Sequence, residues 1–156
     1  MLPMVTVPAE LAAASALLDA ETENLAQVGA MSRRQILGIM VEVPAVAIAP
    51  HLFSSAAFFS IGSNDLTQYV TAAARDSHRV ADLCDVRHPA VLQLIQNIAE
   101  FGAHTGMEVS LCGDAASDPK LIPTLLLSSG IRSLSVAPAA LGAVKAAIAE
   151  MRLDGR

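Results

Sequence analysis

The sequence predicts an α/β protein with parallel strands, on three observations. Short apolar runs alternate with longer alanine-rich stretches that have helical spacing. This alternation repeats five times, as in strands that are joined by crossover helices. The apolar runs are apolar at odd and even positions alike, as expected of a sheet covered by helices. Hydrophobic residues make up 53% of the chain and charged residues 16%, which excludes disorder and predicts a sizeable core.

Each element can be placed from its local pattern. The expected strands are Leu2–Val5, Ile36–Val41, Phe58–Ile61, Glu108–Leu111 and Ser133–Val136. The expected helices are Pro8 to about Gln27, Ala45–Phe53, Leu66–Ala74, Ala90–His104, Pro119–Ser129 and Ala139–Met151. For the first helix we expect Thr6 as the N-cap, with Pro8 near the first turn, where a missing N–H has no consequence.

The length also bears on the architecture. Five strand–helix units in 156 residues take about 31 residues each. A complete (β/α)8 barrel of about 250 residues also takes about 31 per unit. Residues 1–156 therefore fit one domain, which is either five-eighths of a barrel or a complete open sheet.

Composition excludes several classes of partner. A formal net charge of −5 is not the basic footprint of a nucleic-acid-binding protein. No uninterrupted apolar run reaches the roughly 18 residues of a membrane span, and the N-terminus lacks the basic region of a signal peptide. Cys84 and Cys112 stand far apart in the sequence and form no CxxC pair. We therefore expect reduced thiols in a cytoplasmic protein.

Polar residues follow three of the expected strands. Glu42 comes directly after the second strand, Gly62-Ser63-Asn64-Asp65 follows the third, and Cys112-Gly113-Asp114 follows the fourth. In parallel α/β folds, ligands bind at the carboxyl ends of the strands. These groups are therefore expected to converge on one site.

The residue types suit a phosphorylated substrate and a divalent cation. Glu42 and Asp65 are hard oxygen donors of the kind that Mg²⁺ takes, together with water and substrate phosphate. Backbone N–H groups of the turn before the next helix could hold an anion. Cys112 could act as a general acid or a nucleophile, and Arg75 could bind a phosphate or carboxylate bidentately.

Each residue also has an ordinary structural interpretation. Glu42 could cap the following helix or pair with Arg33 or Arg34. Asn64 and Asp65, taken alone, are typical turn and capping residues.

Cys112 alone fits a small buried residue, Arg75 alone fits a surface charge, and Cys84 is expected to be structural. The histidines show no metal-binding spacing and are expected to be solvated or to cap helices; they are His51, His78, His88 and His104. Convergence at three successive strand ends favours the functional interpretation of Glu42, Asp65 and Cys112.

Several segments carry a resemblance to a known family. They are Gly38–Pro44, Phe58–Tyr69, His88–Leu92, Leu111–Asp114 and Ser133–Pro138. In order and spacing they resemble the PEP-utilising enzymes, and within them the C-terminal PEP-binding barrel of the Enzyme I family of the bacterial phosphotransferase system. Pyruvate phosphate dikinase and PEP synthase share these strand ends.

The resemblance implies a role for each residue. Glu42 and Asp65 match Mg²⁺ ligands, while Asn64 and Asp65 match positions that hold the PEP phosphate, partly through backbone amides. Arg75 matches an arginine that contacts PEP, and Cys112 matches the acid that protonates C3 of the enolate as pyruvate forms. Three local departures are Asp114 in place of glutamate, Ser117 in place of glycine, and Ser63 in place of threonine.

The resemblance also implies a partial (β/α)8 TIM barrel, about strands 4–8 with their helices. Strands 1–3 with two further PEP-binding arginines, and the domain whose histidine accepts the phosphoryl group, have no counterpart in these residues. The complete enzyme would pass the phosphoryl group to a phosphocarrier protein and form a homodimer. We expect the 156 residues alone not to complete the transfer.

Three alternatives stay open. The chain could be the corresponding part of a dikinase or PEP synthase. It could be a non-catalytic dimerisation or regulatory module. An open-sheet ligand-binding domain rests on fold analogy alone.

Overall fold

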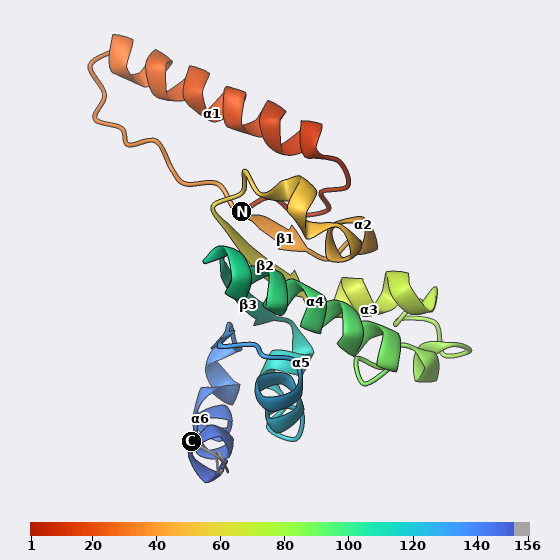
Figure 1. The fold of residues 1–156 in the computed structure, drawn as a ribbon. Coiled ribbons are helices and arrows are strands. Elements are labelled where there is room, and N and C mark those ends of the chain that lie inside the picture. The colour runs from red at the N-terminus through yellow and green to blue at the C-terminus, as the bar shows by residue number, and fades with distance from the viewer. Residues whose placement is uncertain (152–156) are drawn as a thin grey trace.

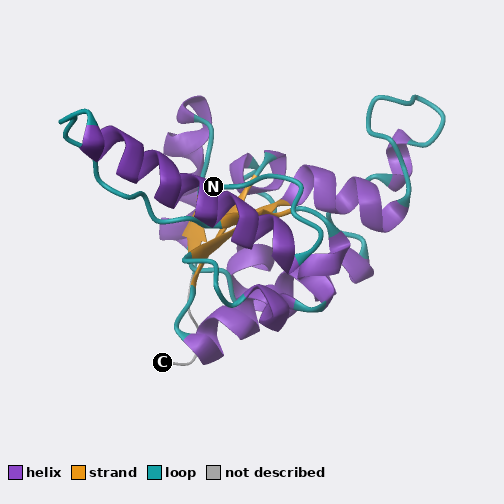
Figure 2. Ribbon diagram, turned by 90° about the horizontal axis from the view of Figure 1, so that it is seen from above, coloured by secondary structure: helices purple, strands orange, loops and turns teal. Residues whose placement is uncertain are grey.

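The computed structural model describes residues 1–151, and its centre is a four-stranded parallel sheet. The strands are β1 (Ile39–Val41), β2 (Phe58–Gly62), β3 (Glu108–Cys112) and β4 (Ser133–Leu134), in the order β1-β2-β3-β4. Strands adjacent in the chain are thus adjacent in the sheet. Figure 2 shows the strands in the middle of the molecule with helices around them. The α/β class with parallel strands is confirmed.

Helical segments connect the strands. The α-helices are α1 (Pro8–Gln27), α2 (Pro44–Ile48), α3 (Ser63–Thr71), α4 (Pro89–Thr105), α5 (Asp114–Ser117) and α6 (Leu141–Glu150). Short 3-10 turns span Pro50–Phe53, Ala81–Leu83 and Pro138–Ala140, and one π-helical turn spans Thr124–Ser128. Residues 152–156 of the expected domain lie outside the described residues. Among residues 1–151, no helix is both long and apolar enough to cross a membrane.

The first expected strand, Leu2–Val5, is wrong as a strand. Leu2 alone pairs with Ile39, through one isolated parallel bridge. Pro3 has no N–H to donate to a ladder, and Met4 turns into the left-handed region at φ 55°. The N–H of Met4 consequently binds a side chain instead of a strand.

Two expected helices are shorter in the structure than the sequence pattern predicted. The segment Ala45–Phe53 is an α-helix to Ile48 and then a separate 3-10 turn that begins at Pro50. The helix expected at Pro119–Ser129 is confirmed only in its later part: residues 119–121 form a turn, and the helical segment 122–128 includes the π-helical turn Thr124–Ser128. Pro50 removes one backbone donor and crowds the preceding turn, whereas Pro123 lies in the first turn of its helical segment, where proline is tolerated.

Two expected helix starts also shift. The N-cap of α1 is Val7 rather than Thr6. The Glu10 carboxylate accepts hydrogen bonds from the backbone N–H of both, at 2.6 Å from Thr6 and 2.9 Å from Val7. Those two donors hold the pKa of Glu10 below its usual range, Val7 contributing more than Thr6. Helix α3 begins three residues before the expected Leu66, so that Asn64 and Asp65 lie in its first turn.

The two faces of the sheet differ in chemistry. Strand register places Val41, Ile61 and Leu111 in one row, and these residues are fully buried in the main core. The core also holds Ile95 and Ile98 of α4, so the helices cover this face. The alternate row is Met40, Ser60, Ser110 and Ser133. Since side chains alternate along a strand, small polar groups occupy the opposite face.

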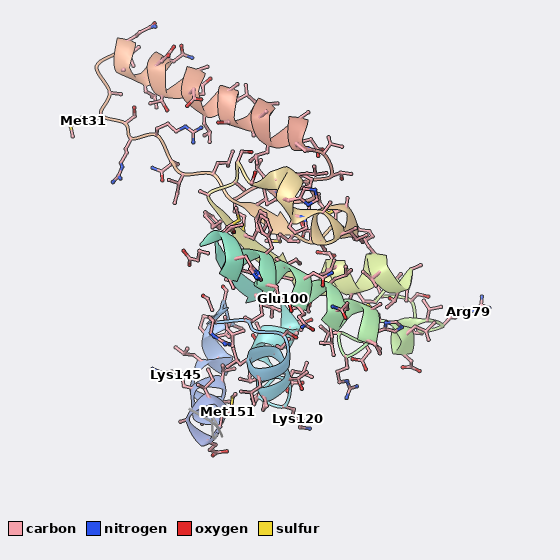
Figure 3. The ribbon with its side chains drawn as sticks, in the orientation of Figure 1. Met31, Arg79, Glu100, Lys120, Lys145 and Met151 are labelled. Carbon is pink, nitrogen blue, oxygen red and sulfur yellow. The ribbon has the colours of Figure 1, made fainter. Side chains whose placement is uncertain are left out.

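Helix α1 lies apart from the other helices, beside the β1 edge of the sheet (Figure 1). Of its twenty residues only Leu11 is buried. An extended segment returns the chain from α1 to β1 and passes Met31, whose side chain projects away from the body (Figure 3). The site residues expected from the sequence lie at or after the ends of the strands, and none of them is on α1.

Candidate functional site at the strand ends

Glu42 follows β1 directly and is buried, with 3% of its surface exposed. Its Oε1 accepts the backbone N–H of Met4 at 2.7 Å. The left-handed conformation of Met4 aims that N–H at the carboxylate. A buried carboxylate needs such a partner, because an unpaired charge is costly away from water. One oxygen of Glu42 is therefore held by the main chain.

Glu42, Gly62 and Cys112 lie side by side at the ends of three strands. Val41 pairs with Ile61, so Glu42 follows opposite Gly62, and Gly62 pairs with Cys112. A Cβ atom on Gly62 would lie 3.0 Å from Oε2 of Glu42. Because Gly62 has no side chain, Oε2 of Glu42 can lie close to strand β2. All three belong to the polar face of the sheet.

Helix α3 starts directly after Gly62 and brings Asp65 to its first turn. Asp65 is half-buried, and none of the hydrogen bonds or ion pairs found within residues 1–151 uses its carboxylate. The backbone N–H groups at the start of a helix have no partners in the helix, and the helix dipole is positive there. An anion bound by these N–H groups would therefore lie close to the Asp65 carboxylate at the N-terminus of α3.

The thiol of Cys112 is half-buried at the last position of β3. It donates to the carbonyl oxygen of Ile61 at 3.3 Å. The next residues of the loop contact α3, because Asn64 binds Asp114 and Ser63 binds the carbonyl of Cys112. The ends of β2 and β3 therefore form one connected structure.

Asn64 and Arg75 line the same cavity, of about 530 Å³. Arg75 lies after the end of α3, is exposed, and donates its backbone N–H to Oε1 of Gln68 at 3.4 Å. The cavity lining also includes the aspartates Asp82, Asp85, Asp114 and Asp118 and the second arginine Arg87. Glu42, Asp65 and Cys112 are not part of that lining. The structure thus groups Asn64 with Arg75, and Glu42 with Cys112, around the start of α3.

Two of the residues that line this cavity form an ion pair. Asp85 and Arg87 form a bidentate contact, with Nη2 of Arg87 2.7 Å from Oδ2 of Asp85. Hydrogen bonds from the Arg87 side chain hold the pKa of Asp85 below its usual range. This segment follows the outward loop that carries Arg79 at its end (Figure 3).

The structure tests several of the structural roles that the sequence left open for these residues. Arg34 pairs with Asp19 at 2.7 Å rather than with Glu42. Helix α2, which follows Glu42, has no side-chain N-cap bond, and neither has α3. The capping role expected for histidines is confirmed at His88, whose Nδ1 accepts the N–H of Ala90 at the start of α4.

Three residues make contacts in the site that sequence reasoning did not predict. Met4 holds Glu42 through a main-chain N–H, which no side-chain pattern could reveal. Ser63 and Asp114 were named within the strand-end segments and as departures from a family pattern, but the hydrogen bonds that they make across the site were not predicted. A glycine directly between Cys112 and Asp114 was the one available signal, since it permits a backbone shape that other residues avoid.

Glu42 and Asp65 fit a Mg²⁺ site in which the protein supplies only two of the ligands. Within residues 1–151, no group of three or more His, Cys, Asp or Glu side chains could enclose a metal ion. Two carboxylates are nevertheless what Mg²⁺ often takes from a protein, because it keeps water and substrate phosphate in its shell. Glu42 is already oriented by Met4, and Asp65 offers an oxygen beside a helix N-terminus.

Fold and site together define a class of protein. It is a parallel α/β domain whose strand ends carry a carboxylate, a thiol and the N-terminus of a helix, and an arginine after that helix lines a cavity with Asn64. The family model described as "PEP-utilising enzyme, PEP-binding domain" matches residues 1–153. The chain belongs to this family.

Named relatives fall into two groups. A probable phosphoenolpyruvate synthase of Pyrococcus horikoshii is 39% identical over 153 residues, which are 96% of this chain and 18% of that protein. A phosphoenolpyruvate-protein phosphotransferase of Haloferax volcanii is 40% identical over 155 residues, 96% of this chain and 26% of that protein. One of Borreliella burgdorferi is 38% identical over 142 residues, 90% of this chain and 25% of that protein. The chain thus spans about a quarter or less of these relatives.

Solved structures support the fold. A malate synthase of Haloferax volcanii, which is TIM-barrel-like, matches with a TM-score of 0.58 and 13% sequence identity. The match covers 99% of this chain and 45% of that chain. At this identity the likeness concerns the fold alone.

Proposed function

We propose that this chain is the PEP- and Mg²⁺-binding part of a phosphoenolpyruvate-protein phosphotransferase of the Enzyme I type. The observation that carries the proposal is the row of Glu42, Gly62 and Cys112 beside the start of α3. This row puts a carboxylate and a thiol next to the first turn of α3, whose backbone N–H groups would bind an anion.

Each residue has a role that its surroundings support. Glu42 and Asp65 would hold Mg²⁺, which neutralises charge on the phosphoryl group when bound. The backbone N–H groups of Asn64 and Asp65 would bind the phosphate, since they lie in the first turn of α3. Arg75 shares a cavity with Asn64 and would bind a phosphate or carboxylate oxygen.

Cys112 would supply the proton that completes pyruvate. Its S–H group donates to the Ile61 carbonyl, and this bond orients the thiol at the end of β3. After the phosphoryl group leaves PEP, the S–H bond would break and a C–H bond would form at C3 of the enolate. The enolate oxygen then becomes the carbonyl of pyruvate, and the thiolate is reprotonated from water.

The whole protein would contain more than this chain. We propose a (β/α)8 barrel to which residues 1–156 contribute about strands 4–8. The row Met40, Ser60, Ser110 and Ser133 supports this, because it lies on the face of the sheet opposite the helices, which in such a barrel is the inner face. A separate domain would carry the acceptor histidine and serve a phosphocarrier protein, and the complete enzyme would act as a cytoplasmic homodimer.

A PEP synthase is the second candidate, because phosphoenolpyruvate synthases are among the most similar relatives. The two candidates differ in where the phosphoryl group goes. Full-length parent protein that phosphorylates a carrier protein from PEP without nucleotide supports the phosphotransferase. Nucleotide-dependent formation of PEP from pyruvate, with no carrier phosphorylation, supports the synthase.

The metal site can be tested on the chain itself with Mn²⁺, which stands in for Mg²⁺ and is seen by electron paramagnetic resonance. We expect wild-type chain to bind Mn²⁺ and to bind it more tightly when PEP is present. Glu42→Gln and Asp65→Asn should each weaken binding by at least about tenfold, since each removes one ligand charge. The matched control is Glu23→Gln, on exposed α1, which should change nothing.

Folded chain whose Mn²⁺ binding is absent, or equal in wild type and both site variants, would contradict the proposed metal site. It would favour the non-catalytic dimerisation or regulatory module. Circular dichroism on each variant separates loss of the site from loss of the fold.

A further inference from the structure

The loop after β3 is fastened to the start of α3 by three hydrogen bonds. Ser63 Oγ donates to the carbonyl of Cys112 at 2.7 Å. The backbone N–H of Asp114 donates to Oδ1 of Asn64 at 3.0 Å, and Nδ2 of Asn64 donates to Oδ2 of Asp114 at 3.0 Å. We call the two bonds between Asn64 and Asp114 the clasp. They join residues that are 50 positions apart in the chain.

Gly113 shows how closely the two segments approach. Its backbone has φ 92° and ψ −171°, a conformation that is essentially restricted to glycine. A Cβ atom there would lie 2.5 Å from Oγ of Ser63 and 2.8 Å from Oδ1 of Asn64. The path of the loop that follows Cys112 is therefore fixed by contact with α3.

The clasp uses both ends of the Asn64 amide. Its oxygen accepts from the main chain of residue 114 and its nitrogen donates to the Asp114 carboxylate. The side chain of Asn64 therefore anchors the loop that carries Cys112, while its backbone N–H in the first turn of α3 stays available to a phosphate.

We propose that Asp114 is a positioning residue, which acts through Asn64 to hold the Cys112 thiol against the Ile61 carbonyl. The role of Cys112 as proton donor rests on the proposed function, but the positioning itself does not. Asp114 is exposed, so its hydrogen bond to Asn64 adds little to global stability. Loss of the Asp114 carboxylate is therefore expected to act locally, on the position of the Cys112 thiol.

Alkylation of the thiols by iodoacetamide tests this on the full chain, with the rate at each cysteine read by peptide mass spectrometry. Cys84 is the internal reference, because it is also half-buried but lies outside the clasp. Asp114→Ala removes one bond of the clasp, and Asp114→Asn keeps an oxygen that Asn64 can donate to. A general loosening of the fold would raise both alkylation rates, whereas loss of positioning raises only that of Cys112.

We expect Asp114→Ala to raise the Cys112 rate about fivefold relative to Cys84, the effect of one lost hydrogen bond, and Asp114→Asn to stay within about twofold of wild type. Asn64→Asp sets two carboxylates against each other and should also raise the Cys112 rate. The double variant Asn64→Asp with Asp114→Asn should return it toward wild type, because it exchanges donor and acceptor.

An unchanged Cys112-to-Cys84 ratio in Asp114→Ala would overturn the proposal. So would equal ratios in Asp114→Ala and Asp114→Asn, since the hydrogen bond would then not matter. Failure of the proposed function would give another result. Wild-type chain would then bind neither PEP nor metal, while the Cys112-to-Cys84 alkylation ratios of the variants would still follow the proposal.

Discussion

Gly113 offers the sharpest test of how the site is built. Replacing it with alanine forces a side chain into a backbone conformation at φ 92° and ψ −171° that costs about 1–3 kcal/mol. The added Cβ atom would also meet Ser63 Oγ at 2.5 Å and Asn64 Oδ1 at 2.8 Å, so one of these groups must move. That movement would break at least one hydrogen bond, worth about 1 kcal/mol.

Gly106→Ala is the matched control. Gly106 follows α4 at φ 75°, and a Cβ atom there would meet no heavy atom within 4 Å. This variant carries only the penalty of the left-handed conformation, about 1–2 kcal/mol. The excess loss in Gly113→Ala therefore measures the steric contact between the loop and α3 together with the difference between the two backbone penalties.

Urea denaturation followed by circular dichroism gives both free energies of unfolding. We expect Gly113→Ala to lose about 2–4 kcal/mol and Gly106→Ala about 1–2 kcal/mol. Equal losses in the two variants would refute the close approach of the Cys112 loop to Ser63 and Asn64.

Three further predictions concern charge and the proposed ligands. The pKa of Glu10 is lowered in the fold, so its contribution to stability is present at neutral pH and is lost as pH falls through the carboxyl range. Thermal denaturation should therefore show a smaller acid-induced fall in Tm for Glu10→Gln than for wild type, and an equal fall would contradict this. Arg75→Ala should raise the Kd for PEP at least about tenfold by calorimetry, the value of one charged hydrogen bond, while Arg79→Ala serves as the exposed control. Gly62→Ala should weaken Mn²⁺ binding by displacing Glu42, because a Cβ atom would lie 3.0 Å from its Oε2. Unchanged paramagnetic resonance titrations of Gly62→Ala would count against Glu42 as a ligand.

Sequence reasoning predicted the parts of the site that belong to regular elements. Glu42 and Cys112 were placed at strand ends, and the register of β1–β3 does bring them to either side of Gly62. Their positions follow from hydrophobic runs of defined length, which sequence displays directly. Their roles in binding and catalysis stay predictions.

The parts that sequence reasoning missed depend on contacts between distant residues. The hydrogen bond from Met4 to Glu42 spans 38 positions and starts from a main-chain N–H. The clasp between Asn64 and Asp114 spans 50 positions. Pro123, by contrast, was visible in the sequence, and it agrees with the later start of the helix expected at Pro119–Ser129, because proline favours the first turn of a helix.

Calorimetric titration of PEP into the purified chain, with and without Mg²⁺, tests the central claim most directly. We predict heat of binding that requires Mg²⁺, is lost in Asp65→Asn and persists in Glu23→Gln. Absence of binding by chain that circular dichroism shows to be folded would contradict a PEP site formed by these strand ends.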